Sequence, residues 1–181
     1  MTFLDRFLQK WRIRKAMPYI PDQSVVLDIG CHEGELFQQL GSTLGYGVGI
    51  DPLLEKDVIH SKYELLKDLF PSERTENKIY HCITMLAVLE HIPHDDQIKT
   101  IYACFELLHK EGVIILTVPH KKVDTILSIL RKLHLIKGMQ LNEHYGFDAL
   151  EIPRLFENGG FTFVVHKKFQ LGLNNLFVFK K

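Results

Sequence analysis

The segment from Ser24 to Ile29, with the turn that follows it, restricts the fold more than any other part of the chain. The segment is short and almost continuously apolar, which is typical of a strand buried on both faces of a parallel sheet. The turn at 30–34 has a glycine at each end, and a segment predicted to be helical, Glu35 to Leu44, follows at once. A strand, a glycine turn and a helix in direct succession predict an α/β sheet that binds a ligand beyond the carboxyl end of this strand.

Further predicted strands alternate with helices along the chain, which indicates a doubly wound, mostly parallel sheet of the Rossmann-like, seven-stranded type. The expected strands are 47–51, 63–66, 78–85 and 113–118. The expected helices are 96–108, 123–135 and 147–157, with a turn at 110–112. Residues 161–165 and 176–179 predict a closing antiparallel hairpin with its bend at Gly172 and Asn174–Asn175.

Size and charge limit the classes of partner. A chain of 181 residues, 46% of them hydrophobic, is expected to form a single domain over 1–181. Its 22 basic and 22 acidic residues cancel, so no broad field attracts nucleic acid, and none is expected as a partner. Cys31, Cys82 and Cys104 form no close pair, which favours a reducing cytoplasm over a disulfide framework or a structural zinc site.

Residues 1–20 predict an N-terminal amphipathic helix. Over 1–17 its apolar residues recur at helical spacing and alternate with five basic residues, Arg6, Lys10, Arg12, Arg14 and Lys15. No apolar run is long enough for stable membrane insertion or secretion. Two interpretations stay open: the apolar stripe packs on its own domain, or the helix makes peripheral contact with an anionic membrane.

Acidic residues around the glycine turn indicate the kind of ligand. A dinucleotide site requires G-x-G-x-x-G, whereas residues 30–34 lack that spacing and Glu33 and Glu35 would repel a pyrophosphate. A nicotinamide-dependent oxidoreductase is therefore disfavoured. Asp28 suits a ligand that carries an ammonium or sulfonium group. Asp51, at the end of the second strand, is placed to accept both hydroxyls of a ribose.

Four segments in order resemble class I S-adenosylmethionine-dependent methyltransferases, of the methyltransferase type 11/12-like subfamily. Val25–Gly34 resembles the first motif of that family, and Gly47–Pro52 resembles its acidic ribose-binding loop. Met85–Ile92 is similar to the segment after the fourth strand, and Leu107–Ile115 to the entry into the fifth strand. The stretch 142–163 resembles the usual ending. The resemblance implies a Rossmann-like methyltransferase fold with S-adenosylmethionine as cofactor.

The resemblance also implies cofactor contacts, residue by residue. Around the methionine part and the adjacent strand ends it implies Asp28, Gly30, Cys31, His32, Gly34, Met85, Leu86 and Ala87. It implies Asp51 and Pro52 at the ribose, Asp68 at the adenine amino group and Leu69 against the ring. The chain between Asp51 and Tyr63 is too short for the usual second helix, so the sheet is expected to be abbreviated after its second strand.

A metal ion is not expected. Glu90 and His91 raise the question, because some relatives carry a further acidic residue three places before this glutamate. Here that position is Ala87, and hard metal ions need several oxygen ligands. His91 is then a helix-entry residue or a base that faces the substrate.

Three histidines in predicted loops are candidates for a general base, since imidazole titrates near neutral pH. His120 ranks first because it follows Val118–Pro119 at the carboxyl end of the fifth strand, and His91 and His144 come next. Residues 120–145 are expected to cover the substrate, although the apolar stripe of 123–135 fits closure of the core equally well.

The sequence thus predicts methyl transfer from S-adenosylmethionine to a small-molecule or glycan-precursor acceptor. The alternative is a non-catalytic protein that binds S-adenosylmethionine or S-adenosylhomocysteine. Methyl transfer needs mainly the alignment of two reactants, so O-, N- and C-methylation, like the oligomeric state, stay open at this level.

Overall fold

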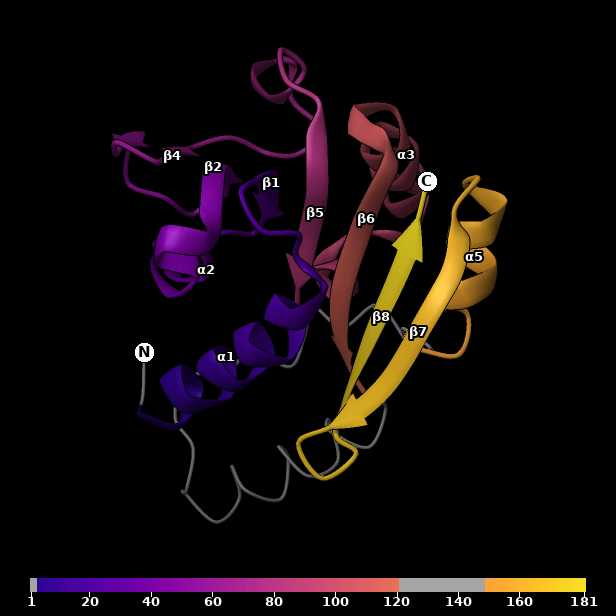
Figure 1. Ribbon diagram of the computed structural model, residues 1–181. Helices are drawn as coiled ribbons and strands as arrows, with labels where there is room; N and C mark the ends of the chain where they lie inside the picture. Colours follow the sequence, from indigo (N-terminus) through magenta and orange to yellow (C-terminus); the bar gives the residue numbers. More distant parts are fainter. Residues whose placement is uncertain (1–2, 121–148) are drawn as a thin grey trace.

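The computed structural model describes residues 3–120 and 149–181, which form an eight-stranded mixed sheet with helices on both faces (Figure 1). The strands are β1 (Ser24–Ile29), β2 (Leu44–Ile50), β3 (Val58–Ile59), β4 (Tyr63–Leu66), β5 (Tyr80–Leu86), β6 (Leu108–Pro119), β7 (Thr162–Phe169) and β8 (Asn174–Lys180). The expected helix at 123–135 and His144 lie outside the described residues.

Strand order gathers the carboxyl ends of five parallel strands at one edge of the sheet. The order is β3-β4-β2-β1-β5-β6-β8-β7, and β4, β2, β1, β5 and β6 run parallel to one another. β8 enters antiparallel between β6 and β7, which confirms the closing hairpin. The fold class expected from the sequence is therefore correct, and the ends of β1 and β2 lie side by side as the ligand hypothesis requires.

Two buried clusters hold the helices against opposite faces of the sheet. α1 (Phe3–Ala16) and α2 (Glu35–Leu40) pack on one face, through a cluster that includes Ile13 and Phe37. α3 (His94–Leu107) and α5 (Ile152–Asn158) pack on the other, where Phe156 stacks on Phe179 of β8. Of the helices in the described part of the chain, none has the length and apolar character needed to cross a membrane.

Several element boundaries differ from those expected. The helix predicted to reach Leu44 ends at Leu40, because Gly41 takes a φ of +53° and Leu44 already pairs with β1. The turn predicted at 110–112 lies within β6, at a shift in its register with β5. The helix predicted from Phe147 begins at Ile152, after a turn at 149–151. Pairing partners distant in sequence decide the first two of these boundaries, and local periodicity does not report such partners.

The abbreviated side of the sheet is confirmed. In place of a helix between β2 and β4, the chain forms the two-residue strand β3, which pairs antiparallel with β4. Val58 lies opposite Leu65, and Ile59 lies opposite Glu64. This edge of the sheet is therefore formed by the short strands β3 and β4, with β4 paired to β2.

Candidate active site

The glycine turn after β1 packs tightly against the segment that follows β5. Gly30 has a φ of +75°, a conformation that glycine adopts without strain. A Cβ built at Gly30 would overlap the side chain of Val88. Gly34 precedes α2 with a φ of +78°, so both predicted glycines occupy left-handed positions. These glycines bring the main chain of the turn close to neighbouring residues, as a turn that holds a ligand requires.

Asp51 links the end of β2 to the turn after β1. Its Oδ2 accepts a hydrogen bond of 2.9 Å from the amide of His32, and its Oδ1 accepts one of 2.9 Å from the amide of Leu53. The carboxylate is 7% exposed, and Pro52 beside it is exposed. Each carboxylate oxygen has two lone-pair sites, so both oxygens keep capacity for a ligand hydroxyl.

Asp28 is a buried carboxyl at the end of β1. Its Oδ1 accepts a hydrogen bond of 2.6 Å from the hydroxyl of Thr84 on β5. The pKa of Asp28 is raised to about 7, mainly by burial, which outweighs the lowering effect of the Thr84 hydrogen bond, and the charges of Glu35 and Asp51 also raise it. The group therefore titrates near neutrality, and a nearby cation would favour its ionised form.

A hollow of about 80 Å³ lies between this turn and α1. Its lining residues are Gln9, Arg12, Ile13, Asp28, Gly30, Cys31, Glu35, Leu36 and Leu86. Two of their polar atoms, Nε of Arg12 and Oε2 of Glu35, are buried and have no hydrogen-bond partner among the described residues. Buried polar groups are normally satisfied, so these atoms indicate a place for a polar ligand or water.

Arg12 is a site candidate that the sequence analysis missed. Burial lowers the pKa of its guanidinium, and the carboxylates of Glu90 and Asp5 partly offset that effect. Helical spacing in the sequence was the one sign of this role, because it places Arg12 on the same face of the helix as Gln9, Ile13 and the buried Ala16. A cation on the buried face of an amphipathic helix needs a negative partner, which in a protein or ligand is most often a carboxylate.

The other residues predicted around the methionine part point in different directions. Leu86 lines the hollow, whereas the side chain of Met85 is fully buried in the core on the α3 side. Ala87 has a φ of +64°, and its amide bonds the carbonyl of Thr117 at 2.9 Å. Cys31 is 3% exposed, and burial is the main cause that raises the pKa of its thiol, as expected for a packing residue.

Asp68 and Leu69 follow β4 and do not line the hollow. Asp68 accepts hydrogen bonds of 2.8 Å from the amide of Leu69 and 2.6 Å from the hydroxyl of Ser72. The Ser72 hydrogen bond is the main cause that lowers the pKa of Asp68. The side chain of Leu69 is 68% exposed, so an apolar surface is available beside the carboxyl ends of β2 and β4. Their contact with adenine stays a prediction.

Two of the three candidate bases lie in the described part of the chain, at the same edge of the sheet. His120 directly follows β6 and is half-buried, and its amide bonds the carbonyl of Leu173 at 2.9 Å. His91 is exposed and ends the 3₁₀ turn Leu89–His91 after β5. Because β5 and β6 are neighbours, both histidines lie near the carboxyl ends of the parallel strands.

His32 belongs to an exposed acidic group at the start of α2. Its Nδ1 lies 3.0 Å from Oε1 of Glu35, and ligand atoms of His32, Glu33 and Glu35 fall within 4.8 Å of one another. Such exposed groups commonly occur without an ion. Glu90 is 2% exposed and distinct from this group. The expectation that no metal is needed stays a prediction.

Solved structures show where this fold has been seen before. Magnesium protoporphyrin IX methyltransferase from Synechocystis PCC 6803, determined with bound S-adenosylhomocysteine, is 17% identical, with a TM-score of 0.67 over 100% of this chain and 88% of that one. A SAM-dependent methyltransferase from Archaeoglobus fulgidus is 16% identical, with a TM-score of 0.69 over 97% and 94% of the two chains. The N-methyltransferase NodS from Bradyrhizobium japonicum WM9 is 15% identical, with a TM-score of 0.61 over 98% and 96%. At these identities the likeness is one of fold.

Comparison of sequences assigns the family. No curated protein sequence matches this chain significantly. A family profile described as a methyltransferase domain matches residues 2–167, which is most of the chain. This match spans the glycine turn, Asp51 and the segments after β5 and β6. The chain therefore belongs to the methyltransferase domain family and is a class I S-adenosylmethionine-dependent methyltransferase.

Proposed function

We propose that this protein methylates a small-molecule or glycan-precursor acceptor and holds the amino-acid end of S-adenosylmethionine in the hollow between α1 and the turn after β1. The observation that carries the proposal is the charge arrangement around that hollow. Asp28 and Glu35 stand on one side and Arg12 on the other, which complements the ammonium and carboxylate of an amino acid. At about 80 Å³ the hollow has room for a head group, because a water molecule occupies roughly 30 Å³ of liquid.

The rest of the cofactor would follow the carboxyl ends of the strands. Asp51, fixed by the amides of His32 and Leu53, would accept the ribose hydroxyls beside Pro52. Asp68 and Leu69, after the next strand, would meet the adenine. Gly30 would keep the turn beside the ligand in place by letting it lie against Val88, since a side chain at this position has no room.

The protein aligns the two reactants and keeps water away from them. When bound, S-adenosylmethionine supplies an electrophilic methyl group on a sulfonium centre. Ile13, Leu36 and Leu86 provide an apolar wall to the hollow, and α1 lies over it, so water is kept from this end of the site. His120 is the first candidate to take a proton from a hydroxyl acceptor, with His91 and His144 as the others.

The assignment of a small-molecule acceptor depends on the charge balance of the chain. The equal numbers of acidic and basic residues provide no broad field for nucleic acid. Cys31, Cys82 and Cys104 are buried and unpaired, which suits a reducing compartment such as the cytoplasm. The alternative function is non-catalytic binding of the cofactor or its product.

Calorimetry of S-adenosylmethionine and S-adenosylhomocysteine binding tests the proposed site. We expect Arg12→Gln and Asp28→Asn each to weaken binding about tenfold or more, because each removes a charge-assisted hydrogen bond. Arg14→Gln is the matched control, since Arg14 lies on the exposed face of the same helix. Full affinity in both site variants would remove the hollow from the cofactor site.

Product formation separates the two functions. The wild-type protein is incubated with S-adenosylmethionine and a metabolite extract, and methylated products are sought by mass spectrometry. Release of S-adenosylhomocysteine together with a methylated metabolite supports the enzyme. Tight cofactor binding without either product across broad extracts favours the non-catalytic alternative.

A further inference from the structure

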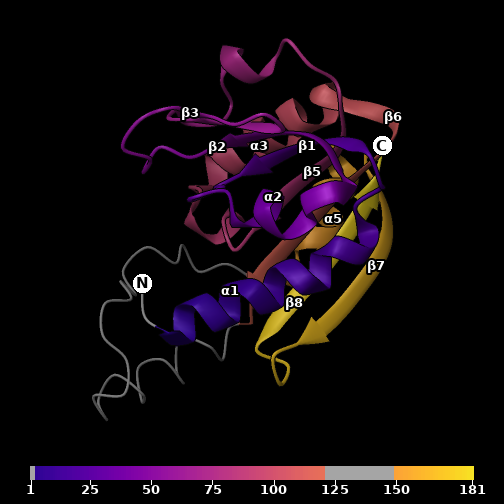
Figure 2. The same ribbon diagram turned by 60° about the vertical axis from the view of Figure 1, so that its left-hand side comes forward.

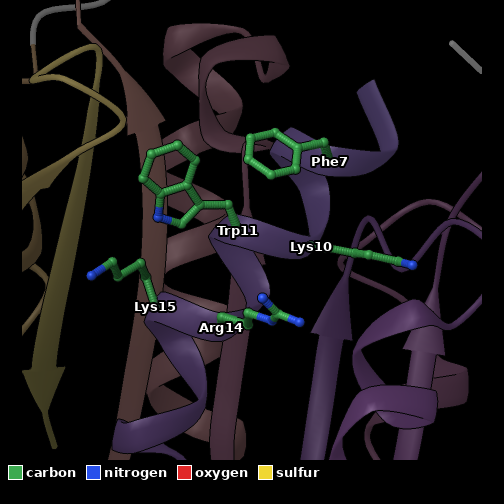
Figure 3. A pocket seen from close by; sticks show the side chains of 5 residues that line it. All are labelled: Phe7, Lys10, Trp11, Arg14 and Lys15. Carbon is green, nitrogen blue, oxygen red and sulfur yellow. The ribbon is translucent and has the colours of Figure 1, made fainter. Parts of the chain in front are cut away.

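α1 has two chemically different faces. Gln9, Arg12 and Ile13 face inward and line the cofactor hollow. The outward stripe consists of Phe7, Lys10, Trp11, Arg14 and Lys15, which recur at spacings of three and four residues and so share one side of the helix (Figure 3). We call this set of five residues the outer face of α1. The inner face and the half-buried ring of Trp11 account for the packing of the helix on its own domain. The exposed Phe7 ring and the three exposed cations need another explanation.

The outer face combines two aromatic rings, an exposed Phe7 and a half-buried Trp11, with three exposed cations. Phe7 is 51% exposed and meets Trp11 edge to face, with ring centroids 5.6 Å apart. The five residues line a hollow of about 460 Å³. Among residues 3–120 and 149–181, no carboxylate forms an ion pair with Lys10, Arg14 or Lys15. Because the whole chain has a formal net charge of zero, these cations represent local segregation of positive charge.

The tip of the β7–β8 hairpin lies next to α1 (Figure 2). The side-chain amide of Gln170 donates a hydrogen bond of 3.1 Å to the carbonyl of Leu8, which ties the tip to the helix. The next residue, Leu171, is 96% exposed and has a φ of +58°. Glycine or asparagine suits such a turn position better than leucine. An apolar side chain held there in solvent is explained by a contact with an apolar partner.

We propose that the outer face of α1, together with Leu171, docks onto the surface of a lipid bilayer that contains anionic lipids. Tryptophan and phenylalanine favour the boundary between headgroups and acyl chains, and lysine and arginine attract anionic headgroups. A helix with these two components lies in the plane of the interface with its apolar side chains inserted. Phe7, Trp11 and Leu171 are the inserting residues, and Lys10, Arg14 and Lys15 bind the headgroups.

Trp11 provides a direct readout, since it is the only tryptophan in the chain. The protein is mixed with vesicles of phosphatidylcholine alone or with about one third phosphatidylglycerol. With the anionic vesicles we expect a blue shift of tryptophan fluorescence, protection from acrylamide quenching and co-sedimentation. Salt at about 0.5 M should weaken binding by screening, and neutral vesicles should bind far less.

Charge-neutral variants identify the surface. Lys10→Gln/Arg14→Gln/Lys15→Gln should lower the partition coefficient for anionic vesicles about a hundredfold, as expected for three headgroup contacts. The matched control, Lys56→Gln/Lys110→Gln/Arg154→Gln, removes three exposed cations from other elements and should bind as the wild type does. Leu171→Ser should reduce the blue shift with Trp11 in place. Equal melting temperatures of all variants exclude loss of the fold as the cause.

Three results would overturn the proposal. The first is the absence of a fluorescence shift and co-sedimentation with anionic vesicles. The second is equal binding of the outer-face variant and its control. The third is binding to a soluble acidic polypeptide such as polyglutamate without binding to vesicles, which would assign the outer face to a protein partner. Cofactor calorimetry is independent of all three, because it probes the opposite face of α1.

Discussion

The hydroxyl of Thr84 donates a hydrogen bond of 2.6 Å to Oδ1 of Asp28, and the two residues lie directly opposite each other in the β1–β5 pair. Both side chains are buried, with 0% and 4% exposure. Burial raises the pKa of Asp28 to about 7 and outweighs this hydrogen bond. Two consequences can be measured, one for cofactor affinity and one for stability.

Cofactor affinity should depend on pH through Asp28. If Asp28 binds the ammonium group as a carboxylate, protonation below pH 7 weakens binding by up to about tenfold per pH unit. Calorimetry of S-adenosylhomocysteine between about pH 5.5 and pH 8.5 measures this slope. Asp28→Asn should bind weakly with a flat profile, and a wild-type affinity that is constant over this range would contradict the assignment.

The stability of the free protein should respond to pH in the opposite sense. The pKa of Asp28 is raised from 3.8 to about 7, so the folded state holds a proton that the unfolded state has released between these values. This contribution to the free energy of unfolding is complete below about pH 4 and is lost as pH rises through 7. Asp28→Asn should therefore gain stability relative to the wild type as pH rises, as measured by urea titration at several pH values. A constant difference would argue that Asp28 keeps an ordinary pKa.

Asp51→Ala should weaken S-adenosylmethionine and S-adenosylhomocysteine binding, because two hydroxyl-to-carboxylate hydrogen bonds of about 1.5 to 3 kcal/mol each would be lost. The melting temperature should also fall, because the amides of His32 and Leu53 lose their acceptor. Asp22→Ala, at an exposed position before β1, is the control for both readouts. Unaltered affinity in a folded Asp51→Ala protein would exclude Asp51 from the site.

Gly30→Ala should destabilise the fold more than Gly41→Ala. Both glycines have a positive φ, +75° and +53°, so alanine is strained by about 1 to 2 kcal/mol at either position. Only at Gly30 does the added Cβ also overlap Val88, whereas nothing lies within 4 Å at Gly41. Val88→Ala should restore part of the loss in the Gly30→Ala background. Equal free energies of unfolding for the two single variants would show that the turn and the Val88 segment separate easily.

His120→Ala should lower turnover about a hundredfold or more, while S-adenosylhomocysteine affinity stays near that of the wild type, if the acceptor is a hydroxyl. The half-buried position of His120 at the end of β6 motivates its first rank. His91→Ala and His144→Ala are measured in the same assay. Unchanged turnover in all three variants would indicate that alignment alone suffices for an acidic or strongly nucleophilic acceptor.

The family and the succession of the strands along the chain follow from local sequence. The apolar run at 24–29 is β1, the weak pattern at 63–66 coincides with β4, and the glycines at 30 and 34 both have positive φ. Such features depend on residues that are adjacent in the chain. They follow from the pattern of apolar residues, from the residue types at turns and from the backbone freedom of glycine. The positions of Asp28 and Asp51, each at the end of its own strand, follow for the same reason.

Tertiary structure alone decided which side chains meet at the site. Arg12 reaches the hollow because α1 packs across the turn after β1, and Leu86 faces that hollow while Met85 faces the core on the other side of the sheet. Helical periodicity shows that α1 has two faces but not what each face contacts. The Gln170–Leu8 hydrogen bond joins residues 162 positions apart, and the end of α2 at Leu40 depends on where β2 begins to pair. Contacts between distant segments depend on packing of the whole core, so no local pattern specifies them.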